Sequence, residues 1–403
     1  MSKQLTTHVA LSEVAEVRFS SVDKHTVAGE KAVRLCNYTD VFKNRFIADS
    51  MNFMTASATD SEIGRFGLRH GDIAITKDSE TPEEIGIPAL VERPSPDLVL
   101  GYHLALIRAK AERCDPYFLA AALQSRHVAR HYLRTAVGLT RFGLSIKAVA
   151  DTPVPNIPLV TQRKIGRWYR ESARLESHTD ALIAAKREQK RGLMQQLLTG
   201  KVRFPGFTEP WKTVRLEQVA SLRNAKAVAG ADLHVRCVEL EHIEQGTGEI
   251  LGWAPAGSTV SLKTAFQPGD VLFGKLRPYL KKFALVDFAG FCSTEIWALV
   301  ANQGEVTPRY LRLLVESTVI QRAANATSGT KMPRADWDVV AATSVQLPPI
   351  IEQNRITSLT WAIETELRLL RMQRVAMSTQ RRGLMENLLS GDITIPSSDT
   401  CAA

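Results

Sequence analysis

The stretch Arg191-Gly192-Leu193-Met194 occurs a second time in this chain, as Arg382-Gly383-Leu384-Met385. Leu197-Leu198-Thr199-Gly200 then matches Leu388-Leu389-Ser390-Gly391 at the same offset of 191 residues, the spacing from Arg191 to Arg382. Solenoid repeats have periods of roughly 20–50 residues, so a single offset this long indicates a duplicated domain. A protein with two similar halves can address a target or a partner that also comes in two parts.

The repeat extends well upstream of these two stretches. Between the matching segments the register slips, which is expected where one copy carries an insertion. Each half is therefore predicted to hold a β-rich region followed by a long helix. The further matches are Pro158 with Pro349, Gln162 with Gln353, Gly138 with Gly329, 71–73 with 269–271, and 11–15 with 216–220.

Two long segments, 161–200 and 352–391, contain no proline and are rich in Arg, Gln, Glu, Leu and Ala. In the second segment, apolar residues recur at spacings of three and four, as in a coiled coil, with interruptions at Arg374 and Arg381. The stripe of the first segment is sparser. Neither stripe is wide enough for a helix that is buried all round, so we expect the two helices to pair with each other.

The predicted fold class is α+β, with an internal pseudo-twofold duplication. Two β-rich domains are separated by two long antiparallel coiled-coil helices. Gly200 and Gly391 are expected to end the helices, because glycine readily adopts the left-handed conformation found after a helix C-terminus. The predicted boundaries are 1–158 for the first β-rich domain, 159–204 for the central helix, 205–349 for the second β-rich domain, 350–395 for the distal helix, and 396–403 for a polar tail.

The repeated helix ends have two interpretations. They could form an ordinary interdomain coiled coil, or they could be docking sites for two copies of one partner. A near-identical stretch kept in two copies favours docking. The candidate docking residues are Leu193, Met194, Leu197, Leu198, Leu384, Met385, Leu388 and Leu389.

Two pairs of loops in the β-rich regions carry cations: the first pair is 77–84 and 275–282, and the second pair, before each helix start, is 137–145 and 328–334. After the turn at Gly269-Asp270, the second half has the basic run 275–282, whereas the corresponding segment 77–84 of the first half is mostly acidic or polar. Lys and Arg beside Tyr can neutralise phosphates and contact base edges. Solvated surface loops and plain turns have a similar composition, and both alternatives stay open. The candidate DNA contacts are Lys77, Arg141, Lys147, Lys275, Arg277, Tyr279, Lys281, Lys282, Lys331 and Arg334.

Composition limits the class of protein. The chain has 403 residues, 44% of them hydrophobic, and a formal net charge of +9, which is compatible with a polyanionic partner such as nucleic acid. No apolar run reaches the roughly 18–20 residues of a membrane span, and residues 1–8 lack the apolar core of a signal peptide. Five cysteines, an odd number with no close pair, argue against a disulfide framework and a zinc site. We expect a cytoplasmic protein without a membrane partner.

No catalytic constellation is evident in the sequence. There is no phosphate-binding loop, no glycine-rich cofactor fingerprint and no metal-ligand spacing of histidines, so we expect no catalytic residues and no metal. The segment 115–118 is similar to a motif of amino-methyltransferases but lacks its second proline, and its repeat partner is 307–310. We interpret both segments as helix starts with proline at the first helical position.

The residues that carry a family resemblance are the run 269–280, the segment 292–296 and the twice-used Arg-Gly-Leu-Met…Leu-Leu-x-Gly. Together they resemble the specificity subunit of type I restriction-modification systems, over nearly the whole chain. The resemblance implies two target recognition domains that read a bipartite, asymmetric DNA site, and two helices that act as a ruler between the half-sites. It also implies that the chain itself performs no chemistry.

The resemblance implies several partners. These are double-stranded DNA, two methyltransferase subunits that modify adenine with S-adenosylmethionine, and, where present, two restriction subunits that use ATP and Mg²⁺. The chain itself is expected to bind no cofactor. Three alternatives remain: a specificity subunit for a fused nuclease-methyltransferase of the type IIB kind, a bridging scaffold that does not read DNA, and a methyltransferase with a degenerate motif. The DNA motif depends on side-chain placement, which no spacing in the sequence reveals.

Overall fold

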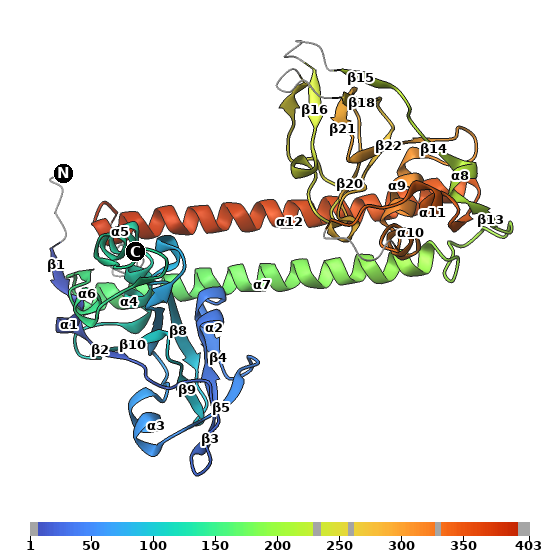
Figure 1. Cartoon of the computed structure of the whole chain (residues 1–403). Helices are drawn as coiled ribbons and strands as arrows, with labels where there is room; N and C mark the ends of the chain where they lie inside the picture. The colour runs from blue at the N-terminus through green and yellow to red at the C-terminus, as the bar shows by residue number, and fades with distance from the viewer. Residues whose placement is uncertain (1–6, 229–234, 257–261, 327–331, 394–403) are drawn as a thin grey trace, which may run out of the picture. The chain divides into compact units, whose positions relative to one another are not determined.

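Two helices dominate the computed structural model of the chain (Figure 1): α7 spans Leu159–Leu197, and α12 spans Ile350–Ser390. The structure describes residues 7–228, 235–256, 262–326 and 332–393. It divides into unit 1, which comprises 1–181 and 372–403, and unit 2, which comprises 182–371. Each long helix therefore contributes one segment to each unit.

Unit 1 contains a five-stranded sheet in the order β2-β10-β6-β8-β4 and a three-stranded sheet in the order β5-β3-β9. Two small ladders, β1-β12 and β11-β7, complete its strands. The strands are β1 (His8–Ala10), β2 (Ala15–Phe19), β3 (Lys31–Cys36), β4 (Phe46–Ala48), β5 (Met54–Ala58), β6 (Ile73–Thr76), β7 (Asp78–Ser79), β8 (Pro88–Arg93), β9 (Leu98–Leu100), β10 (Leu104–Ala109), β11 (Phe142–Gly143) and β12 (Pro153–Pro155). The short helices are α1 (Leu11–Val14), α2 (Tyr38–Lys43), α3 (Asp60–Phe66), α4 (Pro116–Leu123), α5 (Arg126–Thr135) and α6 (Ile146–Ala150), with a 3-10 turn η1 (Pro82–Glu84).

Unit 2 repeats this plan with a four-stranded sheet in the order β14-β22-β19-β20 and a five-stranded sheet in the order β15-β18-β21-β16-β17. A ladder β13-β23 corresponds to β1-β12 of unit 1. The strands are β13 (Lys212–Arg215), β14 (Ala220–Leu222), β15 (Lys226–Val228), β16 (Arg236–Val238), β17 (Ala254–Pro255), β18 (Leu262–Phe266), β19 (Val271–Gly274), β20 (Phe283–Leu285), β21 (Gly290–Ser293), β22 (Ile296–Ala301) and β23 (Ser344–Leu347). The short helices are α8 (Leu216–Val219), α9 (Pro308–Glu316), α10 (Thr318–Ala324) and α11 (Trp337–Ala341), with 3-10 turns η2 (Leu240–His242) and η4 (Pro278–Leu280).

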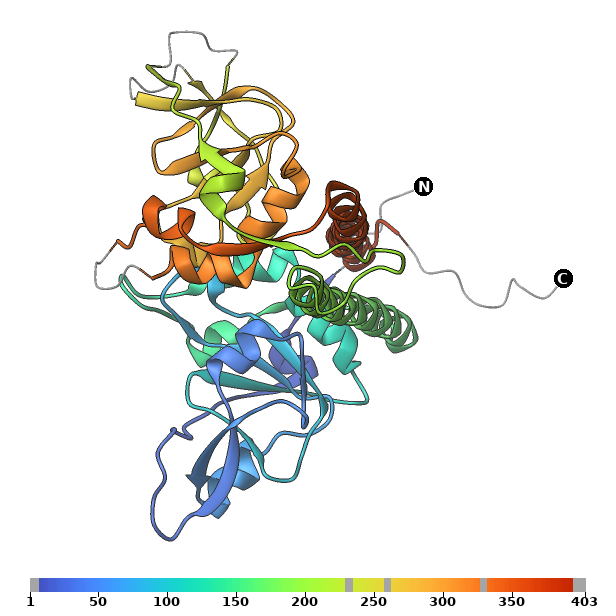
Figure 2. The same cartoon turned by 90° about the vertical axis from the view of Figure 1, so that its right-hand side faces the viewer.

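Each unit has a helix-side core and an outer core. In unit 1, side chains of α4, α5, α6 and α7 share one cluster with Met385 and Leu389 of α12, and a second cluster fills the space around the three-stranded sheet. Unit 2 has the same division, with Met194 and Leu197 of α7, and Leu198 directly after it, in its helix-side core. In Figure 2 the teal helices of unit 1 lie beside the green long helix, whereas the blue helix α3 lies at the outer end with the three-stranded sheet.

The long-helix segments pair antiparallel within each unit. In unit 1, Glu176 contacts Arg381 and Asp180 contacts Arg374. Residue numbers therefore rise along α7 in the direction in which they fall along α12. In unit 2, Lys186 contacts Glu366 and Lys190 contacts Glu364. The predicted α+β class with two long helices is confirmed.

The repeated polar residues perform the same task in both units. The Gln162 side chain accepts a hydrogen bond from the Asp115 amide and donates one to the Ile157 carbonyl, and Gln353 does the same with Thr307 and Pro348. Asp115 and Thr307 are the N-caps of α4 and α9, and each is followed by proline. Both segments are helix starts, as predicted. Gly200 and Gly391 have φ of 69° and 78°, so the glycines past both helix ends are left-handed, as expected.

Candidate nucleic-acid interface and helix cores

A Gly-Asp turn holds the start of the central strand in each unit. Gly71 and Gly269 have φ of 84° and 91°, which favours glycine. Asp72 binds the Arg108 guanidinium through both carboxylate oxygens at 2.7 Å, and its Oδ2 accepts the Arg69 amide. Asp72 is buried, so this charge-assisted pair fixes the strand on which the following loop depends.

In unit 2 the same carboxylate has a different partner. Asp270 binds Arg223, which follows β14, at 2.5 and 2.8 Å, and its Oδ2 accepts the Gln267 amide. Hydrogen bonding to Asp270 raises the pKa of Arg223, and hydrogen bonding to Asp72 likewise raises that of Arg108. Both units therefore contain the same turn, but the arginine that binds its aspartate comes from different places: Arg108 lies in β10, and Arg223 follows β14.

The loop after this strand is fixed by a second loop in both units. In unit 2 the Ala335 amide donates to the Lys275 carbonyl at 2.8 Å, and the Arg277 amide donates to the Pro333 carbonyl at 2.8 Å. In unit 1 the Leu144 amide donates to the Lys77 carbonyl at 2.9 Å. Leu144 and Ala335 are related by the repeat offset, so the same hydrogen-bonded contact between two loops is present in both units. This contact is called the joint below. Each unit thus brings together the two loop regions that the sequence singled out separately.

The unit 2 joint presents its cations at the surface. Arg277 and Lys281 flank η4 in the left-handed conformation, with φ of 51° and 49°, and both are exposed. Tyr279 between them is 52% exposed. Left-handed backbone at a residue other than glycine costs about 1–2 kcal/mol. The surrounding hydrogen bonds maintain it and hold the two cations on either side of the turn.

The other candidates of unit 2 are engaged to different degrees. Lys275 is partly buried, and Lys282 Nζ donates to the Leu240 carbonyl at 2.6 Å. Arg334 is exposed and forms an ion pair with Glu295 at 3.0 Å. Lys331 lies outside the described residues.

In unit 1 the cation of the joint points inward. Lys77 is 9% exposed, forms an ion pair with Asp78 at 3.0 Å, and lies over the Tyr102 and Phe19 rings at 4.8 and 5.5 Å. Arg141 and Lys147 are exposed, and Lys147 is 4.0 Å from Asp151. Of the three predicted contacts of this unit, the two exposed ones therefore lie on the second loop and on α6. A DNA contact by Lys77 stays a prediction that requires its rearrangement.

The apolar residues of the repeated helix ends face inward. Met194, Leu197 and Leu198 are buried in unit 2, and Met385 and Leu389 are buried in unit 1. Leu193, Leu384 and Leu388 are partly buried. Packing inside each unit therefore accounts for the repeated sequence, and a docking role for these eight residues stays a prediction.

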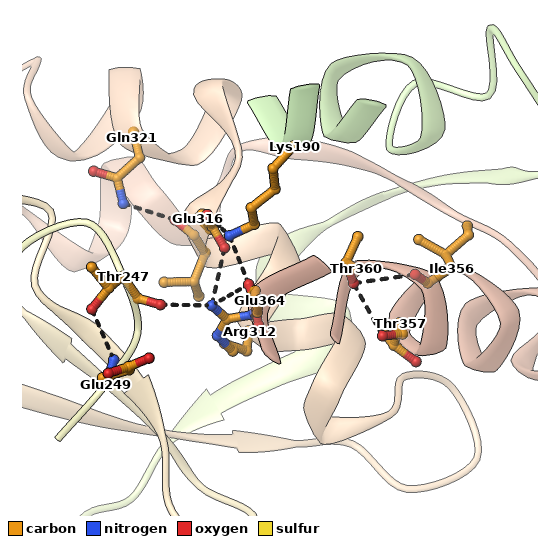
Figure 3. Close-up of polar contacts among 11 residues, drawn as sticks. Lys190, Thr247, Glu249, Arg312, Glu316, Gln321, Ile356, Thr357, Thr360 and Glu364 are labelled. Carbon is orange, nitrogen blue, oxygen red and sulfur yellow. Dashed lines mark hydrogen bonds and ion pairs between the residues drawn. The ribbon is translucent and has the colours of Figure 1, made fainter. Parts of the chain in front are cut away.

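A buried ion network joins the helices of unit 2 to its β-rich domain (Figure 3). Lys190 of α7 lies 2.5 Å from Glu316 of α9 and 2.6 Å from Glu364 of α12. Arg312 binds Glu364 at 2.8 and 3.0 Å and donates to the Thr247 carbonyl at 3.3 Å. Two cations thus share two carboxylates, and the network borders an open groove between the end of α7, α10 and α12.

The corresponding cation of unit 1 is Arg381, which the repeat offset relates to Lys190. It binds Glu176 of α7 at 2.7 Å, and Glu176 also contacts Arg45 at 2.7 Å and Arg374 at 3.4 Å. Burial alone would raise the pKa of Glu176, but hydrogen bonds and charge from Arg45 and Arg381 outweigh it and hold the pKa below its usual range. The Glu176 carboxylate thus forms ion pairs with three arginines.

Several known proteins are similar to this chain. No family model matches the chain. The type I restriction enzyme EcoDI specificity subunit of Escherichia coli is 29% identical over 157 residues, which are 38% of this chain and 34% of that protein. The matched segment therefore spans about a third of the length of this curated relative. The type I restriction-modification S subunit of M. genitalium is 11% identical, covers 96% of this chain and 97% of its own, and has a TM-score of 0.60.

The chain has the fold of a type I specificity subunit. A second solved chain, from work on assembly and conformational transition of the type I R-M system, has a TM-score of 0.52 at 15% identity. It covers 97% of this chain and 99% of its own. The resemblance seen in the sequence motifs is thereby confirmed.

Two arginines that pair the long helices of unit 1 were not predicted from the sequence as functional or structural residues. Arg374 and Arg381 interrupt the apolar stripe of the second long helix, and both bind Glu176. A cation at a core position of a predicted coiled coil is the signal that could have identified them.

Two further findings are limited to the residues that the structure describes. None of their helices combines the length and apolarity needed to cross a bilayer. None of their histidine, cysteine, aspartate and glutamate side chains gather in threes as metal ligands would.

Proposed function

We propose that this chain is a non-catalytic DNA-recognition subunit of a cytoplasmic restriction-modification enzyme. Each unit reads one half of a bipartite, asymmetric DNA site. The long helices dock two methyltransferase subunits, which methylate adenine within the site, and restriction subunits complete the enzyme where they are present.

The observation that carries this proposal is the duplicated joint between two loops. Each unit fixes two loops against one another through the same backbone hydrogen bond, on a strand that begins at an Asp–Arg pair. The joints have different side chains: Arg277, Tyr279 and Lys281 are exposed in unit 2, whereas Lys77 is enclosed in unit 1. One scaffold with two different surfaces suits a target with two different halves, because base edges are read by side chains.

The likeness to the S subunit of M. genitalium along almost the full chain supports the same proposal. In this assignment, S-adenosylmethionine, ATP and Mg²⁺ are used by the partner subunits. The residues of this chain bind DNA, orient it and position the methyltransferases.

The experiment is to co-express the chain with the methyltransferase encoded beside it and to map methylated bases in the host DNA by single-molecule sequencing. The expected result is a bipartite motif with a fixed spacer that disappears when either protein is omitted. A stable complex that methylates no motif would contradict the proposal and favour a bridging scaffold. Binding to DNA separates the two further, because phosphate contacts make affinity fall steeply with salt.

A further inference from the structure

The segment 126–150 of unit 1 combines positive charge with exposed apolar side chains. No aspartate or glutamate occurs anywhere in residues 116–150. Within this stretch, 126–150 is named the basic hairpin segment here; it comprises α5, a hairpin and α6. Its five cations are Arg126, Arg130, Arg134, Arg141 and Lys147, and all of them are exposed.

The cations of α5 lie close enough to influence one another. Burial, together with positive charge from His8, Arg130, His131 and Arg134, lowers the pKa of His127. Carboxylates border the segment at its edges: Glu386 accepts the Arg126 backbone amide, and Asp151 lies 4.0 Å from Lys147. Asp78 of β7 pairs with Gly143 at the base of the hairpin, and the acidic turn η1 packs against α5. The segment itself carries five exposed cations and no carboxylate, so its own contribution to the local field is positive and attracts an anion of extended shape.

The hairpin is built to hold its tip away from the unit. The Val137 amide donates to the Gly143 carbonyl at 3.0 Å, and the Gly143 amide donates to the Val137 carbonyl at 2.9 Å. Gly138 closes the turn with φ of 143°, and a Cβ there would lie 1.9 Å from the Arg141 carbonyl oxygen. Beyond the hairpin, Leu144 is buried in the helix-side core, so the base of the turn is fixed.

This fixed tip carries an apolar residue that contributes little to the fold. Leu139 is 97% exposed, and Val137 on the same hairpin is 75% exposed. Ile146 at the start of α6 is 52% exposed. Three large apolar residues within ten positions, among cations and without an acidic residue, are unlike the isolated apolar residues of an ordinary surface.

We infer that the basic hairpin segment is a DNA-contacting surface of unit 1, in which the cations neutralise phosphates and Leu139 makes an apolar contact with the bases. The inference rests on the proposed function and identifies the element that performs it in unit 1, where Lys77 is enclosed. Charge selects DNA over a protein partner, since five exposed cations in a segment without any acidic residue suit a continuous row of phosphates. Apolar contacts with the thymine methyl group, or a wedge at a base step, are the roles open to such a leucine.

The test uses the complex of the full chain with its methyltransferase and a fluorescent duplex that carries the mapped methylation motif. Leu139→Ala is expected to weaken binding roughly 10- to 100-fold, the value of an apolar side chain removed from water, without changing the salt dependence. Arg134→Ala and Arg141→Ala are expected to weaken binding and to lower the slope of log affinity against log salt by about one each. Val27→Ala and Lys24→Ala, exposed positions of unit 1 outside both the long helices and the basic hairpin segment, are the matched controls and should bind as the unmodified complex does.

Each other outcome overturns a defined part of this account. If the unmodified complex methylates its motif and the Leu139 and Arg variants bind like the controls, the inference is wrong and the proposed function stands. If Leu139→Ala lowers the yield of complex with the methyltransferase, and the complex that still forms binds DNA normally, the segment is a protein-docking surface. If the unmodified complex neither binds nor methylates DNA, the proposed function itself is wrong.

Discussion

Units 1 and 2 bind the cation at the end of a repeated helix in different ways. In unit 1, Arg381 depends on Glu176, which also serves Arg45 and Arg374. In unit 2, Lys190 lies between Glu316 and Glu364, and Arg312 completes an alternating network. Both solutions pair every buried charge, which a low-dielectric interior requires. The two units thus place a cation at the same repeat position, but its carboxylate partners come from different helices: α7 in unit 1, and α9 and α12 in unit 2.

The largest difference between the units is expected on removing a carboxylate charge. Glu176→Gln leaves three cations around one neutral side chain and should destabilise unit 1 by about 3–5 kcal/mol. Glu364→Gln leaves Glu316 available to Lys190 and Arg312, and should cost unit 2 only about 1–3 kcal/mol. Hydrogen exchange followed by mass spectrometry resolves the two units and measures both values. Equal losses would show that the networks are equivalent despite their different composition.

The repeated helix ends allow a second comparison, between packing and docking. Leu197→Ala removes a side chain that is 3% exposed in the core of unit 2 and should lower the free energy of unfolding by about 2–5 kcal/mol. Leu388→Ala, at the same place in the repeat, removes a partly buried side chain and should cost less. Urea unfolding of both variants gives the values. A Leu197→Ala chain of unchanged stability that no longer binds methyltransferase would instead assign this residue to docking.

The Gly-Asp turns permit a third comparison at equivalent strand positions. Arg18 of β2 and Arg223 after β14 correspond in the repeat, but only Arg223 binds the buried aspartate; Arg18 binds the exposed Glu16. Arg223→Ala should therefore cost about 1.5–3 kcal/mol, because Asp270 is left buried without its partner. Arg18→Ala should change stability by less than about 1 kcal/mol, as for most surface pairs. Thermal unfolding measures both, and a larger loss for Arg18→Ala would reverse the assignment.

The last comparison concerns the response of unit 1 to acid. The pKa of Glu176 is lower in the folded chain than its usual 4.5, so its charge contributes stability at pH values above 4.5. That contribution is lost as the pH falls through the folded pKa, because the folded state must then take up a proton. The stability advantage of the unmodified chain over Glu176→Gln should be constant above about pH 5 and shrink as the pH falls from about 4.5 through the folded pKa. An advantage that is constant over this range would exclude Glu176 as the titrating group.

Much of the fold could be predicted from the sequence, because duplication and helical periodicity are both visible in one dimension. The apolar stripe and the paired glycines define the helices, and Asp115 and Thr307 before proline mark helix starts. The antiparallel register was not predictable, since it depends on which residue of one helix meets Glu176 or Lys190 of the other.

The sequence predicted which loops form the candidate DNA interface, but not which of their side chains are exposed. Lys77 and Lys275 match in the repeat, yet Lys77 is enclosed by Tyr102 and Phe19 whereas Lys275 is partly exposed. Those ring contacts come from a strand and a loop distant in sequence, so no local pattern could distinguish the two lysines. The same limit applies to Leu139, whose exposure follows from the hydrogen bonds at the base of its hairpin.

The central claim is that the two units read two different halves of one DNA site. The most direct measurement is single-molecule methylation mapping of the host DNA for two variants of the co-expressed complex, Arg141→Ala in unit 1 and Arg277→Ala in unit 2. The account predicts that each variant relaxes or weakens recognition in a different half of the motif and leaves the spacer unchanged. Two variants that alter the same half, or that leave every position of the motif as it was, would contradict it.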